Sequence, residues 1–248
     1  MSKPSESTTG ISRTEAFYPS LETLVSDVPG FSPPDQLYTL YLLAVASSSL
    51  PGDIVEIGSW GGRSAVALGL AAQRTGDCTV HCIDLFPNRD DWYRNEDGTY
   101  SFRVNIEGKS IGAYESQRVW PEPYETIIAP LYEKYAGILE IFQGTITRTR
   151  LTRVVKPFRG TSQSFFDASP ALRCRLAFID GDHGYDAVCA DIRSVQERLV
   201  PGGWICFDDA FSGYEGVDRA INDLIIANPS FNFIQQLTRK LFVARSVR

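Results

Sequence analysis

Short apolar runs alternate with helix-like segments along most of the chain, and this alternation restricts the fold more than any other feature of the sequence. The runs are mostly continuous in their apolar character, as expected for strands that are covered on both faces. They occupy residues 53–58, 78–84, 153–160, 175–180 and 203–209. Helices are predicted between them, at about 64–73 and 185–199. We therefore predict an α/β fold with a doubly wound, mostly parallel sheet and helices on both faces.

The two ends of the chain add further elements to this pattern. Residues 1–15 are rich in Ser, Thr and Lys and are predicted to form a mobile tail or a lid that folds over a ligand. Residues 16–52 are predicted to form an N-terminal helical segment that ends at Pro51-Gly52. A helix near 216–227 and the short runs "FNFIQ" and "LFVA" predict an antiparallel edge of the sheet. We expect residues 16–248 to form one domain.

A polar and aromatic segment, residues 87–150, interrupts the alternation. It is longer than an ordinary connection between a strand and a helix, and insertions of this size often determine ligand specificity. The alternative is a surface elaboration with a short helix in "APLYEKYAGILEIF". Trp92 and Trp120 either stack on a ring of the ligand or anchor the segment.

Composition and charge argue against several classes of partner. The formal net charge is -6, and no cluster of Lys and Arg is interleaved with aromatic residues, so we expect no binding to nucleic acid. The five cysteines include no CxxC pair, which is typical of reduced thiols in a cytoplasmic protein. No apolar run approaches the roughly 20 residues that span a bilayer, and no signal core is present at the start of the sequence. We therefore expect a soluble, cytoplasmic protein without a membrane partner.

The stretch "VEIGSWGGRSAVALGLAA" runs from a strand through a glycine-rich turn into a helix, an arrangement that lets backbone amides approach a ligand. Trp60 occupies the place of the second glycine in a dinucleotide fingerprint, so a pyrophosphate would be obstructed. A ligand without phosphates therefore suits the turn better. Asp84 ends the next strand, where α/β proteins that bind nucleotides often contact the ribose hydroxyls.

Acidic residues gather where two later strands end. Asp180 and Asp182 follow one strand, and Asp208 and Asp209 follow the next. All four are expected at the same edge of the sheet as the glycine turn. Burying several uncompensated carboxylates together costs free energy, which a bound divalent cation would offset. An all-oxygen set of ligands favours Mg²⁺ or a similar hard ion.

Four motifs together, "EIGSWGGRS", "IDLF", "IDGDH" and "LVPGGWICFDD", resemble the class I S-adenosylmethionine (SAM)-dependent methyltransferases. Within that family the chain is most similar to metal-dependent small-molecule O-methyltransferases, and nearer to those that modify sugars and rings in antibiotic pathways than to the catechol-type enzymes. The resemblance covers residues 53 to about 245 and implies a Rossmann-like, seven-stranded sheet with an antiparallel edge strand. It also implies a Mg²⁺-assisted transfer of the methyl group of SAM to a hydroxyl of a small secondary metabolite.

The resemblance also implies roles for individual residues. Asp180, Asp208 and Asp209 match the family's metal ligands, and Asp182 and His183 compete as the general base. No lysine follows "IDGDH", whereas the catechol-type enzymes use one there. The residues implied for the cofactor are Glu56, Gly58, Ser59, Gly62 and Ser64 for its methionine part, Asp84 for the ribose, Gly160, Thr161 and Ser162 for the adenine, and Asp180 beside the metal.

Several alternatives remain at this point. The acceptor atom is sulfur or nitrogen in one of them. A nicotinamide-dependent oxidoreductase would share the sheet, but Trp60 argues against it. A non-catalytic relative that only binds the cofactor would have no reason to keep four converging carboxylates. His81 lies within a predicted strand and is expected to be a core histidine. The oligomeric state stays open, with a homodimer through the N-terminal helix as one form.

Overall fold

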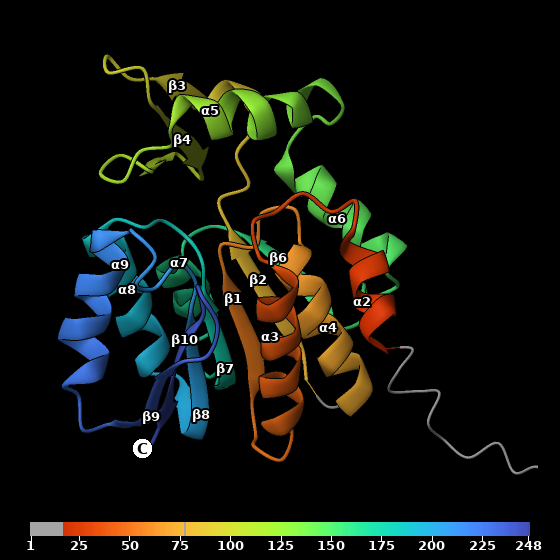
Figure 1. Cartoon of the computed structure of the whole chain (residues 1–248), viewed down its shortest axis with the longest axis vertical. Coiled ribbons are helices and arrows are strands. Elements are labelled where there is room, and N and C mark those ends of the chain that lie inside the picture. Colours follow the sequence, from red (N-terminus) through yellow and green to blue (C-terminus); the bar gives the residue numbers. More distant parts are fainter. Residues whose placement is uncertain (1–16, 77) are drawn as a thin grey trace, which may run out of the picture.

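A computed structural model describes residues 17–76 and 78–248, and a seven-stranded sheet forms its centre (Figure 1). The strand order is β6-β2-β1-β7-β8-β10-β9. β10 runs antiparallel to both β8 and β9, and the other neighbours are parallel. The predicted α/β sheet with an antiparallel edge is therefore confirmed. The strands are β1 (Asp53–Ile57), β2 (Val80–Asp84), β6 (Val155–Arg159), β7 (Cys174–Ile179), β8 (Leu199–Phe207), β9 (Phe231–Gln236) and β10 (Phe242–Ser246).

Helices cover both faces of this sheet (Figure 1). Successive residues of β1 point to opposite faces, so Ile54 joins the core beneath α2, α3, α4 and α6, and Val55 joins the core beneath α7, α8 and α9. Both side chains are fully buried, which explains why the strand is apolar at consecutive positions. The helices are α2 (Phe17–Val25), α3 (Pro34–Ala46), α4 (Arg63–Thr75), α6 (Ile138–Arg148), α7 (Ser162–Ala168), α8 (Tyr185–Gln196) and α9 (Glu215–Ile221).

The insertion contains a second sheet that the sequence analysis did not predict. Its antiparallel strands are β3 (Trp92–Arg94), β4 (Tyr100–Ile106) and β5 (Lys109–Ala113). Figure 1 shows β3 and β4 beyond the carboxyl ends of β1 and β2, so the small sheet forms a roof over that edge of the main sheet. The short helical turn η1 (Arg89–Asp91) precedes this sheet, and three more follow it, namely α5 (Pro121–Pro123), η2 (Tyr124–Ile128) and η3 (Ala129–Glu133).

Two predicted helices are each divided into two elements in the structure. The helix expected in "APLYEKYAGILEIF" is divided into η3 and the longer α6, which are separated by Gly137 in an extended conformation. The helix expected near 216–227 is α9 followed by a wider turn, η4 (Asn222–Ile226). The predicted tail or lid at 1–15 lies outside the described residues. Within 17–76 and 78–248, no helix has the length and apolar character needed to cross a membrane.

The carboxyl ends of three central strands are joined closely at Gly58. Its amide donates to the carbonyl oxygen of Ile83 in β2 (2.8 Å), and the amide of Asp180 after β7 donates to the carbonyl oxygen of Ile57 (2.8 Å). Gly58 has φ +88°, and a Cβ atom there would overlap the backbone carbonyl of Asp180. Only glycine fits this position.

Replacing Gly58 with Ala is expected to lower the free energy of unfolding by more than about 2 kcal/mol, because the new methyl group meets backbone and the positive φ is strained. Urea unfolding followed by circular dichroism measures the change. The control is Gly144→Ala in α6, where a Cβ meets no atom within 4 Å, and we expect a stabilisation of up to about 1 kcal/mol there. Equal stability of the two variants would contradict the packing described for Gly58.

Candidate functional site

A cavity of about 630 Å³ lies at the carboxyl ends of the central strands, beneath the roof formed by the small sheet. This volume is typical of pockets for small molecules and cofactors. Glu56 and Gly62 do not line it, but every other residue proposed from the sequence does. These are Gly58, Ser59, Ser64, Asp84, Gly160, Thr161, Ser162, Asp180, Asp182, His183, Asp208 and Asp209.

The glycine turn after β1 forms one wall of the cavity. Gly62 has φ +90° and precedes the first turn of α4, whose residues Arg63 and Ser64 line the cavity. The first amides of a helix have no partner within the helix and can bind a ligand. Asp84 Oδ2 accepts a hydrogen bond from the amide of Trp60 (2.9 Å), and Oδ1 accepts one from the amide of Phe86 (2.6 Å). Burial raises the pKa of Asp84, although these two amides and that of Ser59 oppose the shift. The carboxyl group is therefore held in a fixed orientation at the cavity wall.

Several polar atoms at this turn are buried without a hydrogen-bond partner among the described residues. They include both carboxylate oxygens of Glu56, Ser59 Oγ and Trp60 Nε1. Glu56 is fully buried, and burial raises its pKa despite the opposing influence of nearby Ser59, Ser64 and Cys82. Buried polar atoms are normally paired, so these orphaned groups fit a polar ligand or ordered water at the turn.

The turn after β6 forms a second wall. Thr161 Oγ1 accepts from the amide of Ser164 (3.1 Å) and so caps α7. Ser162 Oγ donates to Asp191 Oδ1 (2.6 Å), which lies on α8 and also lines the cavity. Burial raises the pKa of Asp191 to about 7, with Asp182 adding to the shift and Ser162 opposing it. Asp191 is not among the residues predicted from the sequence, because no motif surrounds it and its place in the fold depends on the packing of α8.

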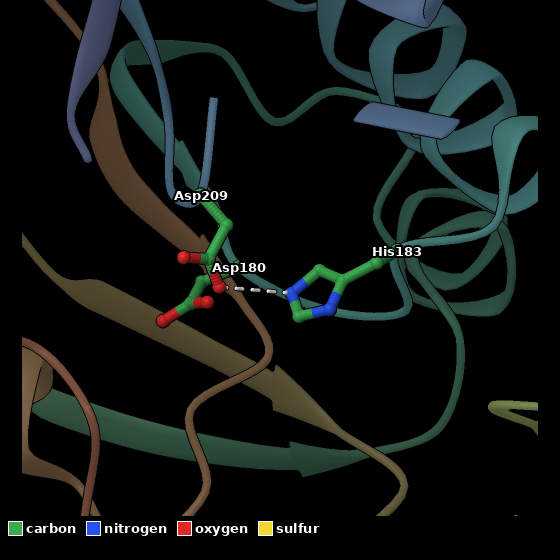
Figure 2. A group of neighbouring side chains, drawn as sticks. All are labelled: Asp180, His183 and Asp209. Carbon is green, nitrogen blue, oxygen red and sulfur yellow. Dashed lines mark ion pairs between the residues drawn. The ribbon is translucent and has the colours of Figure 1, made fainter. Parts of the chain in front are cut away.

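Three acidic residues meet where β7 and β8 end. Ligand atoms of Asp180, His183 and Asp209 all lie within 4.8 Å of one another (Figure 2). Burial, and then repulsion from Asp208, raises the pKa of Asp180 well above its ordinary value. Asp208 Oδ1 accepts from the amide of Asp209 (2.8 Å). The donors brought together thus differ in one member from the predicted set, with His183 in the place of Asp208, and a group of this kind could hold a metal ion.

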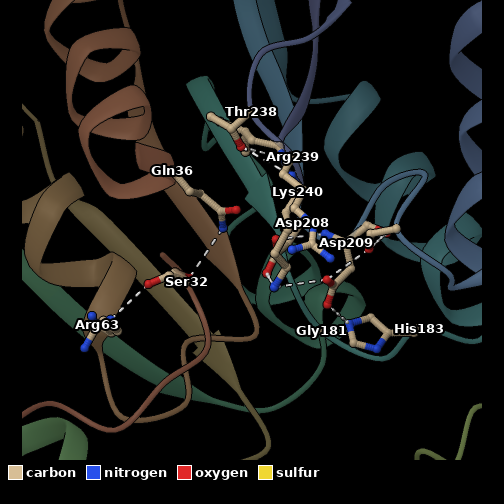
Figure 3. A network of polar contacts seen from close by, with 12 residues as sticks. Ser32, Gln36, Arg63, Gly181, His183, Asp208, Asp209, Thr238, Arg239 and Lys240 are labelled. Atoms are coloured by element: carbon tan, nitrogen blue, oxygen red, sulfur yellow. Dashed lines mark hydrogen bonds and ion pairs between the residues drawn. The ribbon is translucent and has the colours of Figure 1, made fainter. Parts of the chain in front are cut away.

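Lys240 enters this acidic cluster from the turn between β9 and β10 (Figure 3). Its Nζ atom lies 3.3 Å from Asp208 Oδ2 and 3.0 Å from Asp209 Oδ1. Burial lowers the pKa of Lys240, but Asp208 and Asp209 outweigh this effect and raise it above its ordinary value. The ammonium group therefore offsets part of the negative charge. Lys240 is not among the residues predicted from the sequence, because it lies in a C-terminal hairpin that carries no motif.

Asp182 and His183, which compete as the general base, lie in different surroundings. Asp182 Oδ2 accepts from the amide of Tyr114 (2.5 Å) and Oδ1 from the amide of Gly184 (2.7 Å), so the side chain joins the end of β5 to the loop after β7. His183 Nε2 lies 3.5 Å from Asp209 Oδ2. Burial lowers the pKa of His183 even though Asp209 and other nearby carboxylates oppose the shift, which favours neutral imidazole.

The roof and a segment before α3 close the cavity. Trp92 lines the cavity and is also anchored in the structure. Its Nε1 atom donates to the hydroxyl of Tyr132 (2.8 Å), and its ring packs on that of Phe102 with 4.9 Å between the ring centroids. Trp120 also lines the cavity, and 67% of its surface is exposed. Arg63 donates to the carbonyl oxygen of Ser32 (Figure 3) and to those of Val25 and Val28. It thereby holds the segment that includes cavity residues 29–32.

His81, the second histidine, lies outside the cavity. Its Nε2 atom is 2.8 Å from Asp53 Oδ2, at the amino end of β1. It therefore pairs within the structure, as expected for a core histidine.

Comparisons with known proteins support the sequence-based family resemblance. A protein-family model described as a methyltransferase domain matches residues 55–210 of the chain. A Streptomyces olivaceus protein, 8-demethyl-8-(2,3-dimethoxy-alpha-L-rhamnosyl)-tetracenomycin-C 4'-O-methyltransferase, is 26% identical over 167 residues, which are 66% of this chain and 55% of that protein. The chain thus spans about half the length of this curated relative.

Two solved structures are similar to the whole fold. The O-methyltransferase NovP has 17% sequence identity and a TM-score of 0.56, over 87% of this chain and 81% of that one. TomG from Streptomyces achromogenes, an O-methyltransferase involved in tomaymycin synthesis and solved in complex with SAM, has 13% identity and a TM-score of 0.55, over 97% and 92% of the two chains. These similarities confirm the predicted Rossmann-like methyltransferase fold.

The buried Asp191 is expected to make stability depend on pH. In the unfolded chain its carboxyl ionises near its ordinary pKa of 3.8, but the folded protein keeps the proton up to about pH 7. The folded state therefore binds more protons between these values, and the free energy of unfolding falls as the pH rises through this window.

Asp191→Asn removes this titration and keeps an oxygen that can accept from Ser162. The free energy of unfolding of the variant minus that of the unmodified protein should rise by at least about 1 kcal/mol when the pH is raised from about 5 to about 8. Urea unfolding at several pH values measures the gain. Asp167→Asn, at an exposed position of α7, is the control and should give no such trend. A parallel pH dependence of Asp191→Asn and the unmodified protein would refute the assignment.

Proposed function

The chain belongs to the methyltransferase domain family, and we propose that it transfers the methyl group of SAM to a hydroxyl group of a small molecule. The observation that carries the proposal is the opening of the glycine turn, Asp84 and the acidic cluster onto one cavity. The O-methyltransferase from Streptomyces olivaceus and the SAM complex of TomG support it.

The cofactor part of the proposal rests on the first wall of the cavity. The glycine turn would hold the methionine part of SAM, since Ser59 and Trp60 line the cavity and their Oγ and Nε1 atoms have no hydrogen-bond partner among the described residues. Glu56, fully buried at the end of β1, would act from behind this wall. Asp84 would accept hydrogen bonds from the ribose hydroxyls, and the turn at 160–162 would border the adenine. When bound, SAM supplies a methyl group on a positively charged sulfur. The protein's task is then to orient the acceptor oxygen in line with that methyl group.

A divalent cation is the second part of the proposal. Asp180 and Asp209 would hold it together with either Asp208, as the family resemblance implies, or His183, as the spacing of the donors favours. If the three carboxylates are ionised, the charge of Lys240 balances only one of them, so the cluster keeps a surplus of negative charge. A bound Mg²⁺ or Mn²⁺ would lower the pKa of the acceptor hydroxyl and fix its direction.

The general base depends on which residue completes the metal site. If Asp208 is the third ligand, His183 keeps a neutral imidazole that accepts the proton of the acceptor. Asp182 then acts as a positioning residue, because both of its oxygens accept from backbone amides. If His183 is the third ligand, Asp182 is the remaining base, and it has to use lone pairs that those amides leave free.

The acceptor is proposed to be a small secondary metabolite with neighbouring hydroxyl groups. The roof presents mainly apolar and aromatic side chains to the cavity, among them Trp92, Phe102 and Ile111. Such a surface suits a sugar or ring with one apolar face. An acceptor sulfur or nitrogen would gain less from the acidic cluster, because hard cations prefer oxygen ligands.

The cofactor part is tested by isothermal titration with S-adenosylhomocysteine. We expect measurable binding to the protein and at least about tenfold weaker binding to Asp84→Ala, which loses the acceptor for the ribose. Asp53→Ala is the control, because Asp53 lies at the amino end of β1, outside the cavity, and this variant should bind as the unmodified protein does.

Thermal melting identifies any loss of structure in these two variants, since Asp84 also accepts from two backbone amides. If the unmodified protein does not bind S-adenosylhomocysteine, the proposed function is wrong. If both folded variants bind equally well, the role of Asp84 is wrong.

A further inference from the structure

The acidic cluster contains a positively charged side chain, that of Lys240. The Lys240 side chain is only 18% exposed, and its Nζ atom contacts one oxygen each of Asp208 and Asp209. Figure 3 shows the side chain directed from its hairpin toward these two carboxylates. The ammonium group therefore lies among the residues that are proposed to bind a metal.

The backbone fixes Lys240 at this place. Its carbonyl oxygen accepts from the amide of Ala210 (3.2 Å), the residue that follows the acidic pair. Gln236 Nε2 donates to the carbonyl oxygens of Ala210 (3.0 Å) and Arg239 (2.9 Å), which joins both sides of the hairpin to the same segment. Thr238 Oγ1 accepts from the amide of Leu241 (3.1 Å) and tightens the turn. The contact is therefore part of the fold of the hairpin and not a chance position of a surface side chain.

Asp209 connects the two cations that the cluster can hold. Its Oδ1 atom faces Lys240 (3.0 Å), and its Oδ2 atom faces His183 (3.5 Å), which belongs to the group of three possible metal donors. A metal ion on this group would share a carboxylate with an ammonium group. Like charges at such short range repel each other, and the partly buried setting screens this repulsion less than bulk water does.

We propose that Lys240 is a built-in cation that competes with the divalent ion and sets the affinity of the acidic cluster for it. Without the ion, Lys240 pairs with Asp208 and Asp209 and keeps both carboxylates in place. When an ion binds, Lys240 gives up part of this pairing. The cluster therefore tolerates the absence of the ion and releases it readily. This inference rests on the metal part of the proposed function.

The test is isothermal titration of metal-free protein with Mn²⁺. Lys240→Met removes the charge and keeps an unbranched side chain, and we expect it to bind Mn²⁺ at least about tenfold more tightly than the unmodified protein. Arg239→Met is the matched control, since it removes the same charge from an exposed neighbour in the same hairpin. Its affinity should stay within about twofold of the unmodified protein.

Two further measurements distinguish a change in metal affinity from a loss of structure. Lys240→Gln can still donate to a carboxylate and should also bind Mn²⁺ more tightly, whereas Lys240→Arg keeps the charge and should not. In EDTA, Lys240→Met should melt at a lower temperature than the unmodified protein, and added Mn²⁺ should raise its melting temperature by more. Equal or weaker binding of Mn²⁺ by folded Lys240→Met and Lys240→Gln, or no binding by any of the proteins, overturns the inference.

Titration with S-adenosylhomocysteine in parallel separates the two claims. Tighter Mn²⁺ binding by Lys240→Met in a protein that does not bind S-adenosylhomocysteine supports the role of Lys240 and overturns the proposed function. Binding of S-adenosylhomocysteine with no change in Mn²⁺ affinity among the variants overturns the role of Lys240 and leaves the cofactor part intact.

Discussion

The site depends on the close approach of β1 and β7 at their carboxyl ends. The missing side chain at Gly58 lets the backbone of Asp180 pass next to the glycine turn, and hydrogen bonds from both residues join β2, β1 and β7. This contact brings the wall proposed for the cofactor and the acidic cluster to the same cavity. Methyl transfer requires donor and acceptor at short range and in line, and the junction of these three strands provides such a meeting point.

The charge of the cavity is the second constraint. Asp180, Asp208 and Asp209 are brought together by parallel strands, and their mutual repulsion within the protein is relieved only in part by Lys240. A surplus of negative charge suits a cofactor with a positively charged sulfur and an acceptor held on a divalent cation. His183 nevertheless favours its neutral form beside these carboxylates, because burial lowers the pKa of its imidazole more than the nearby negative charges raise it.

The sequence predicted the parts of the fold and site that follow from local patterns. The continuous apolar runs indicated the parallel sheet, and residues that directly follow its strands, such as Asp84 and Asp180, line the cavity as expected. No strand is predicted in the insertion, although Tyr100, Phe102 and Val104 of β4 alternate with smaller or polar residues. Lys240 and Asp191 could not be found by such reasoning, since only the packing of a hairpin and a helix brings them to the cavity.

The most direct test of the central claim is mass spectrometry of a panel of polyhydroxylated small molecules incubated with the protein and SAM, with Mg²⁺ or with EDTA. The account predicts that at least one acceptor gains one methylene unit in mass, that S-adenosylhomocysteine forms in equal amount, and that EDTA reduces both products. Methylation of a thiol or amine panel at an undiminished rate in EDTA, with no methylated hydroxyl compound, would contradict the account.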